Sequence, residues 1–200
     1  NTSGTSGTPL KIYCDKKSRQ RHYAFWTRLR EMNGIRRGMK RATFFGRIIM
    51  KPEQNRPPFW RYDAVNKNML FSSYHLSPAN LGAYCKKLHT YMPDEIIGYP
   101  SSLALVARWM KDNGYKGIFP KVVFTTAETL LLNQRRVIEQ AFNCPVIDQY
   151  GCTEMAMFVA QCRKGNYHVH PEHGYVEVVD GEGNPVKEGE IGEIVCTGFV

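Results

Sequence analysis

The chain has 200 residues, of which 42% are hydrophobic and 22% are charged, which is ordinary for a globular protein with a sizeable core. No apolar run approaches the roughly 18 residues of a transmembrane helix, so we expect no membrane span. The net charge of +9 raises nucleic-acid binding as a hypothesis, but no zinc-finger or RNA-recognition signature is present. A solvated basic helix face, or attraction of polyanionic small ligands, also explains the charge.

The first predicted element is a helix over residues 16–33, ended by Gly34. Its expected apolar face consists of Phe25, Trp26, Leu29 and Met32. Residues 42–50 predict a strand, and the proline-rich residues 51–58 predict a loop.

Two further helices are expected in the middle of the chain. Ser77 begins the first, which ends before Pro93. Ser101 or Ser102 caps the second, which continues up to Gly114. Both carry apolar residues at helical spacing, so each should bury one face.

A strand, a helix and a second strand follow, at residues 121–126, 128–142 and 145–151. The first of these strands is almost entirely apolar, as in buried parallel sheets. This alternation predicts an α/β fold with a parallel sheet flanked by helices. Beyond Glu154 the pattern changes to short strands around a turn at residues 181–184, which predicts a smaller antiparallel β portion.

A run of hydroxyls and glycines opens the chain, and an aromatic–hydroxyl–carboxylate motif follows much later. The opening run reads TSGTSGTP, with hydroxyl donors and permissive glycines at Thr2, Ser3, Gly4, Thr5, Ser6, Gly7 and Thr8. The later motif, YGCTE, comprises Tyr150, Gly151, Cys152, Thr153 and Glu154. A nucleoside triphosphate with its metal needs a stacking surface, phosphate donors and a hard oxygen ligand, which these residue types supply. Alone, the first run would indicate a flexible linker. A buried tyrosine followed by a helix capped by Thr153 is the structural alternative for the second.

Together these motifs resemble those of the adenylate-forming (AMP-forming acyl-CoA synthetase and ligase) superfamily. A third segment, GEIGEIVCTG at residues 189–198, is similar to a strand of the same family. The segments VFTTAETL, GYPSSL and YHVHPEHGYVEVVD look most like the phenylacetate–CoA ligase branch, which includes capsular-polysaccharide-biosynthesis relatives. The resemblance spans nearly the whole chain, with the motifs in the right order.

The resemblance implies a role for each motif. The loop from Thr2 to Thr8 would hold the β- and γ-phosphates of ATP. Tyr150 would stack on adenine, Thr153 would donate to the α-phosphate and Glu154 would bind Mg²⁺. Gly151 and Cys152 complete the motif, and Cys152 is expected to line the pocket rather than act as a nucleophile.

Other residues have both a structural and a functional interpretation. The resemblance places Ala127 and Glu128 against the nucleotide, whereas Thr125 and Glu128 also match a capping box at a helix start. Asp148 would line the adenine pocket. Because the carboxyl ends of neighbouring parallel strands share one edge of a sheet, the segments around Glu128 and Tyr150 should converge.

The acyl pocket and a zinc site are also implied by the resemblance. Tyr74, His75 and Tyr99 lie in segments that resemble the acyl pocket and its entrance, although aromatic core packing explains them equally well. Cys162 and His168 would supply two ligands of a structural zinc that a later Cys-x-Cys pair completes. The alternative is a set of surface histidines near a turn, which would include His170 and His173.

The resemblance implies that the chain belongs to an ATP-dependent ligase. Such an enzyme adenylates a carboxylic acid, aromatic or otherwise, and transfers the acyl group to coenzyme A. ATP, Mg²⁺ and coenzyme A are the expected cofactors, with a structural zinc in addition. We expect residues 1–155 to form the α/β nucleotide-binding portion and residues 156–200 to begin a β-rich subdomain. The family's ribose-binding Asp and the catalytic Lys of its C-terminal domain are not among these residues, so the chain is expected to be an inactive fragment by itself.

Three rival functions remain open at this stage. The first is a capsule or surface-polysaccharide biosynthesis protein that adenylates an acid for a non-CoA acceptor. The second is a non-catalytic nucleotide-binding remnant, and the third is a basic nucleic-acid-binding domain. The six cysteines form no C-x-x-C pair, which favours a reducing cytoplasm. A homodimer is compatible with the family.

Overall fold

The computed structural model describes residues 11–199, which form two compact units. The larger unit consists of residues 30–148, and the smaller unit consists of residues 11–29 and 149–199. Helix α1 (Lys16–Met32) begins in the smaller unit and ends in the larger one. Strand β6 (Val146–Gly151) begins in the larger unit and ends in the smaller one. The opening loop at residues 2–8 lies outside the described residues.

The larger unit is built on a mostly parallel sheet. Its strand order is β2-β3-β1-β4-β5-β6. Strand β1 pairs in parallel with both β3 and β4, and β4 pairs in parallel with β5, whereas the edge strand β2 is antiparallel to β3. The bounds are β1 (Arg41–Phe45), β2 (Trp60–Asp63), β3 (Asn68–Ser72), β4 (Glu95–Gly98) and β5 (Val122–Thr126).

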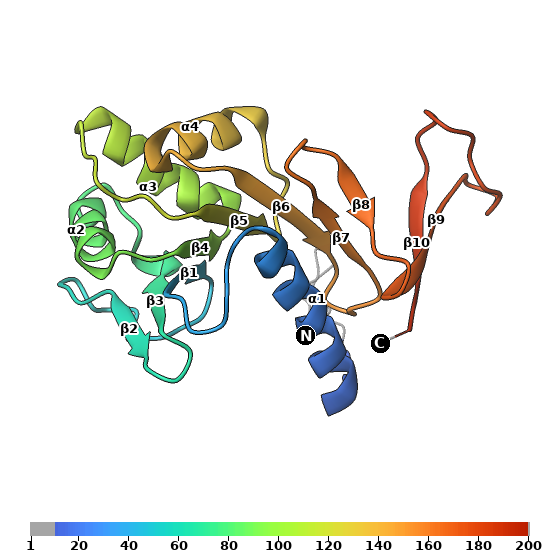
Figure 1. The fold of residues 1–200 in the computed structure, drawn as a ribbon, viewed down its shortest axis with the longest axis horizontal. Helices are drawn as coiled ribbons and strands as arrows, with labels where there is room; N and C mark the ends of the chain where they lie inside the picture. The colour runs from blue at the N-terminus through green and yellow to red at the C-terminus, as the bar shows by residue number, and fades with distance from the viewer. Residues whose placement is uncertain (1–10, 200) are drawn as a thin grey trace. The chain divides into compact units, whose positions relative to one another are not determined.

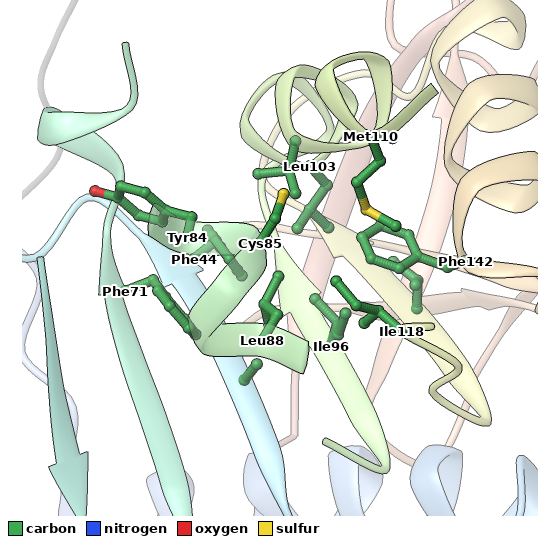
Figure 2. Close-up of a cluster of buried hydrophobic side chains, with 14 of the residues drawn as sticks. Phe44, Phe71, Tyr84, Cys85, Leu88, Ile96, Leu103, Met110, Ile118 and Phe142 are labelled. Carbon is green, nitrogen blue, oxygen red and sulfur yellow. The ribbon is translucent and has the colours of Figure 1, made fainter. Parts of the chain in front are cut away.

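Helices of the larger unit share one hydrophobic core with the sheet (Figure 1). They are α2 (Leu81–Tyr91), α3 (Pro100–Asp112) and α4 (Leu132–Phe142), with a short 3-10 helix at Ser73–His75. Alternate residues of the strands point into this core, as the period of two requires. Figure 2 shows the cluster, whose labelled members are Phe44, Phe71, Tyr84, Cys85, Leu88, Ile96, Leu103, Met110, Ile118 and Phe142.

Several helix starts differ from those predicted. Helix α2 begins at Leu81 rather than at Ser77. Helix α3 has Tyr99 as its N-cap and Pro100 as its first residue, so neither serine caps it. Proline suits this first position because its missing N–H would have no partner within the helix. The strand predicted over residues 42–50 ends at Phe45.

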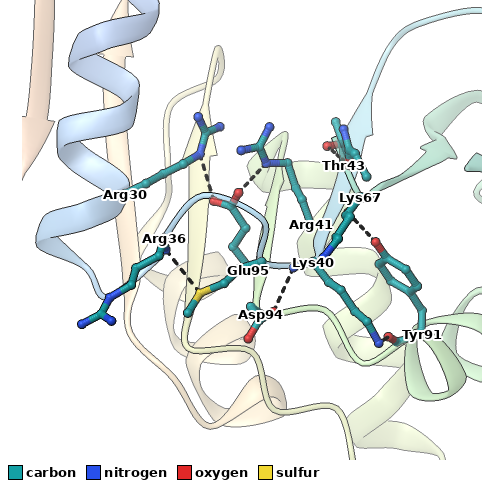
Figure 3. A network of polar contacts seen from close by, with 11 residues as sticks. Arg30, Arg36, Lys40, Arg41, Thr43, Lys67, Tyr91, Asp94 and Glu95 are labelled. Carbon is teal, nitrogen blue, oxygen red and sulfur yellow. Dashed lines mark hydrogen bonds and ion pairs between the residues drawn. The ribbon is translucent and has the colours of Figure 1, made fainter. Parts of the chain in front are cut away.

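A buried acidic residue explains the positions of two of the basic residues. The side chain of Glu95, at the start of β4, is only 2% exposed. Figure 3 shows the guanidinium groups of Arg30 and Arg41 pointing at its carboxylate. The Arg30 Nε–Glu95 Oε2 distance is 3.0 Å. A buried carboxylate needs such partners because its desolvation is costly. These two arginines are therefore structural and do not belong to a solvated helix face.

The smaller unit is an antiparallel β structure that packs on α1. The end of β6 pairs with β7 (Phe158–Gln161), and β7 pairs with β8 (Tyr167–Val169). A separate two-stranded sheet consists of β9 (Gly174–Val179) and β10 (Glu193–Gly198). The Trp26 ring of α1 meets the Phe158 ring edge-on at a centroid distance of 5.5 Å. Met32, expected on this apolar face, is 62% exposed.

The predicted fold class is confirmed: a mostly parallel sheet flanked by helices is followed by a smaller antiparallel portion. The proposed boundary between residues 155 and 156 stays a prediction. Among residues 11–199, no helix has the length and apolar character needed to cross a membrane.

Candidate functional site

Strands β5 and β6 are joined by a buried hydrogen bond. The Thr125 hydroxyl donates to the Asp148 carboxylate across 2.5 Å. Thr125 is completely buried, and Asp148 is 4% exposed. Asp148 precedes Tyr150 of the YGCTE motif by two residues.

The predicted capping box at Thr125 and Glu128 is wrong. Thr125 belongs to β5 and bonds Asp148, and α4 begins only at Leu132. The Glu128 carboxylate instead accepts two bonds from Ser101 near the start of α3, one from the backbone N–H and one from the hydroxyl, each at 3.0 Å. A carboxylate is favourable there because the first N–H groups of a helix have no partners within it.

Ala127 adopts a left-handed backbone conformation, with φ of 68°. A non-glycine residue rarely does so, and such strain concentrates at functional sites. The turn at Ala127 directs the chain out of β5 and places Glu128 beside Ser101. Sequence reasoning did not single out Ser101 for this role, because its partner lies 27 residues away in the chain.

The YGCTE motif presents its functional groups to solvent. Tyr150, at the end of β6, is 49% exposed. Thr153 and Glu154 are exposed in the connection between β6 and β7. That connection is a tight turn, in which the Met155 N–H donates to the Cys152 carbonyl at 3.2 Å. The structural alternative, a buried tyrosine followed by a helix capped by Thr153, is therefore wrong.

Glu128 belongs to the larger unit and the YGCTE motif to the smaller one. Their predicted convergence stays a prediction.

Two of the three proposed acyl-pocket residues meet at Gly46, immediately after β1. The Tyr74 hydroxyl donates to the Gly46 carbonyl at 3.1 Å. A Cβ atom at Gly46 would lie 3.3 Å from the Tyr99 hydroxyl oxygen and 3.6 Å from that of Tyr74. Any larger residue at Gly46 would crowd these hydroxyls. Sequence reasoning did not select Gly46, although a glycine directly after a strand is a signal for close approach.

His75, the third of these residues, is packed into the core. It is 9% exposed, and its Nδ1 lies 2.7 Å from the Ser72 hydroxyl oxygen. Its ring stacks on Phe59 at a centroid distance of 5.4 Å. The core-packing alternative therefore describes His75, whereas Tyr74 is 66% exposed.

Cys162 and His168 are neighbours across the β7–β8 hairpin. Ala160 pairs with His168, and the Cys162 N–H donates to the Asn166 carbonyl at 2.9 Å, so Cys162 and His168 are diagonal neighbours on one face. A side-chain hydrogen bond with His168 lowers the pKa of Cys162 to about 7. A thiolate beside an imidazole is a suitable pair of zinc ligands. Within residues 11–199, no group of three or more His, Cys, Asp or Glu side chains is arranged to hold a metal ion.

The description of His173 as a surface residue is wrong. His173 is completely buried, and its Nε2 lies 3.0 Å from the His22 Nδ1 of α1. Its ring centroid lies 4.8 Å from that of Phe25. Burial and the neighbouring His22 and His170 lower the pKa of His173 to about 4. His173 is thus a neutral core residue of the smaller unit.

Comparison with known proteins supports the fold. No family model matches the chain. The chain is 34% identical over 199 residues to Protein CapK of Staphylococcus aureus, in a match that covers 99% of this chain and 43% of that protein.

Two solved CoA ligases share the fold. A 2-hydroxyisobutyryl-CoA ligase in complex with 2-HIB-AMP and CoA matches with a TM-score of 0.70 and 20% identity, covering 98% of this chain and 47% of that one. The anthranilate CoA ligase AuaEII in complex with anthranoyl-AMP matches with a TM-score of 0.71 and 16% identity, covering 99% and 38%. The chain thus spans less than half the length of each of these relatives.

Proposed function

We infer the function from a premise that the motifs and the comparisons share: the chain has the fold of the adenylate-forming ligases, as its motifs predicted. We propose that it binds ATP and takes part in the adenylation of a carboxylic acid. The observation that carries this proposal is the exposure of Tyr150 at the end of β6, and of Thr153 and Glu154 on the short connection that follows.

Each group of the YGCTE motif has a proposed role that suits its position. The half-exposed Tyr150 ring offers a face on which adenine can stack. The Thr153 hydroxyl donates to the α-phosphate, and Gly151 and Cys152 shape the turn between them. Glu154 is an exposed carboxylate, the type of ligand that Mg²⁺ prefers, so it would hold the ion. When bound, Mg²⁺ would neutralise phosphate charge.

Asp148, Ala127 and Glu128 are proposed to complete the nucleotide site. The Thr125 hydroxyl holds the Asp148 carboxylate in one orientation, which suits a residue that lines the adenine pocket. Glu128 fixes the turn at Ala127 by its two bonds to Ser101. A structural and a nucleotide-binding role can coexist here, because the two bonds to Ser101 use only the side chain of Glu128.

The proposed chemistry has two steps. A carboxylate oxygen of the acid attacks the α-phosphorus of ATP and forms a new O–P bond. The bond between the α-phosphorus and the bridging oxygen breaks, and pyrophosphate leaves with its electrons. A thiol, which we propose to be coenzyme A, then attacks the acyl carbon and AMP leaves. The residues contribute mainly by positioning the reactants and stabilising charge.

The acid is proposed to bind beside Tyr74 and Tyr99. Both hydroxyls lie near Gly46 at the end of β1, where two aromatic rings could flank an aromatic acid. His75 would support the wall from within the core and would not touch the acid.

Cys162 and His168 are proposed as two ligands of a structural zinc. Their neighbouring positions across the β7–β8 hairpin support this proposal. The remaining ligands would have to come from residues other than these two.

A second candidate function keeps the adenylation step but changes the acceptor. The 34% identity to Protein CapK favours the capsule-related branch, in which a surface-polysaccharide precursor would replace coenzyme A. A non-catalytic nucleotide-binding protein is the remaining rival, and the exposed Thr153 and Glu154 argue against it. We propose a cytoplasmic protein, and a homodimer is compatible with the function.

Pyrophosphate exchange tests the proposal. The full-length protein should exchange labelled pyrophosphate into ATP only when a suitable acid is present. A panel of aryl and aliphatic acids, with and without Mg²⁺, covers the proposed substrates. No exchange with any acid, despite measurable ATP binding, would favour the non-catalytic rival. Subsequent addition of coenzyme A or a polysaccharide precursor distinguishes the two acceptors.

A further inference from the structure

Three sulfur-bearing residues gather beside the YGCTE motif in the smaller unit. Gly151 pairs with Phe158 at the end of the β6–β7 ladder. Cys152 and Met157 occupy the next positions outward, so they face each other across the stem of the hairpin. Because side chains alternate between faces, Met157 points away from the face that carries the buried Phe158.

Strand β10 brings a second cysteine to the same place. The Cys196 thiol lies 3.4 Å from the Met157 sulfur. Gly198, two residues further along β10, lies against the same connection, because a Cβ atom there would be 3.1 Å from the Ala156 Cα. Both cysteines are free and partly exposed, whereas Met157 is 5% exposed.

The pKa of the Cys196 thiol is raised above its ordinary value. Burial is the larger cause of the raised pKa of Cys196, and the charge of Cys152 is the second. Geometry places both cysteines beside Met157, Cys152 across the stem of the β6–β7 hairpin and Cys196 on β10.

We propose that Cys152 and Cys196 form a reversible disulfide that ties the YGCTE motif to β10. The connection at residues 152–157 lies outside the paired part of the β6–β7 ladder, so Cys152 can approach β10 without breaking strand pairs. Both sulfurs are accessible to a small oxidant, as modification requires.

The reaction needs a two-electron oxidant, which we take to be a low-molecular-weight disulfide. The Cys152 thiolate attacks one sulfur of the oxidant, and the first small thiolate leaves. The Cys196 thiolate then attacks the Cys152 sulfur of the mixed disulfide and expels the second. Two protein thiols are oxidised, one disulfide is reduced to two thiols, and two protons pass to the leaving thiolates.

The consequence of this bond for ATP rests on the proposed function. Thr153 and Glu154 follow Cys152 directly, so tethering Cys152 to β10 would restrict the residues proposed to meet the α-phosphate and Mg²⁺. The disulfide should therefore weaken ATP binding, and reduction should restore it.

Peptide mapping tests the disulfide independently of any function. The chain is incubated with oxidised glutathione, blocked with iodoacetamide, digested without reductant and analysed by mass spectrometry. We expect a Cys152–Cys196 linked peptide pair and a protein that has lost the mass of two hydrogen atoms. Cys144→Ser should behave like the original chain, whereas Cys196→Ser should carry glutathione at Cys152 without a linked pair. Stable glutathione adducts at both Cys152 and Cys196 in the original chain, or pairing of either with a different cysteine, would overturn the proposal.

ATP binding by the full-length protein tests the consequence. We expect oxidation to weaken binding by at least roughly tenfold in the original protein, with recovery in dithiothreitol, and to leave the unlinked Cys196→Ser variant much less affected. Unchanged ATP binding in the protein shown to carry the linked pair would overturn the regulatory part of the proposal. Absence of ATP binding by the reduced protein would instead contradict the proposed function, while the linked peptide would still support the modification site.

Discussion

Thr125 and Asp148 join two neighbouring strands, with the threonine hydroxyl 2.5 Å from the carboxylate. Both residues are buried, and both precede segments that the motifs assign to nucleotide binding. The bond therefore contributes to the stability of the larger unit at a point two residues before Tyr150.

Replacing Thr125 with valine should test this connection. The change keeps the shape but removes the donor to a buried carboxylate, so we expect a loss of about 1–3 kcal/mol in the free energy of unfolding. Thr125→Ser, which keeps a hydroxyl donor, should retain most of the free energy of unfolding of the original chain. Thr27→Val, at an exposed position of α1, should stay within about 0.5 kcal/mol. Urea unfolding of the three variants measures these differences. Equal stabilities for Thr125→Val and the original chain would show that the bond contributes nothing.

The Glu154→Gln substitution should lower the adenylation activity without lowering the stability of the fold. It removes the charge that we assign to Mg²⁺ with little change in shape, so adenylation should fall by at least roughly 100-fold at unchanged stability. Glu182→Gln, in the exposed turn between β9 and β10, is the matched control and should retain activity. Pyrophosphate exchange across a range of Mg²⁺ concentrations gives the comparison. An unaltered Mg²⁺ dependence would exclude Glu154 as the ligand.

Metal analysis should test the pair formed by Cys162 and His168. Two ligands alone bind zinc weakly, so about one equivalent is expected only in the full-length protein, purified without added zinc or a histidine tag. The double variant Cys162→Ser, His168→Ala should lose this zinc, and His89→Ala should keep it. A zinc content below about a tenth of an equivalent would reject the site, as would an unchanged content in the double variant.

The buried histidines predict a loss of stability in acid. The pKa of His173 is about 4 in the folded chain, below its ordinary value of 6.5, so the unfolded chain binds more protons between these values. Stability should therefore be complete above about pH 6.5 and fall as the pH drops toward 4, by up to roughly 3 kcal/mol for this group.

Other titratable and charged groups lie around His173 and must be considered in choosing a control. Burial also lowers the pKa of His22 and His170, so both contribute in the same direction, while Arg28 and Glu172 form an exposed ion pair nearby. His173→Gln should flatten the decline of stability with acid, and the exposed His89→Gln should not. Urea unfolding at about pH 7 and about pH 5 measures the difference. An equally steep decline in His173→Gln would contradict this assignment.

Elements with strong local patterns could be predicted from the sequence. Helix α1, strand β5 and strand β6 follow hydrophobic periodicity and lie close to their predicted positions. Strand β2 was missed because its edge position buries none of its four residues completely, which leaves no clear alternation. Strand β4 begins with Glu95, whose charge hides a buried strand until Arg30 and Arg41 are placed beside it.

The site shows the same limit of local reasoning. Thr125 and Glu128 have the spacing of a capping box, but Asp148 and Ser101 are their actual partners, and both are distant in the chain. His173 was placed on the surface because the residues that bury it, His22 and Phe25, lie about 150 positions earlier. The YGCTE motif could be identified from the sequence. The exposure of Tyr150 could not, because it depends on the β6–β7 hairpin.

Oxygen transfer from the acid to AMP tests directly whether the protein adenylates a carboxylic acid. The full-length protein is incubated with ATP, Mg²⁺, hydroxylamine as the acyl acceptor, and an acid labelled with ¹⁸O in its carboxylate. Attack of the carboxylate on the α-phosphorus, followed by cleavage at the acyl carbon, leaves one acid oxygen on phosphorus. We expect AMP that carries a single ¹⁸O together with the acyl hydroxamate. Unlabelled AMP, or ADP as the nucleotide product, would contradict it.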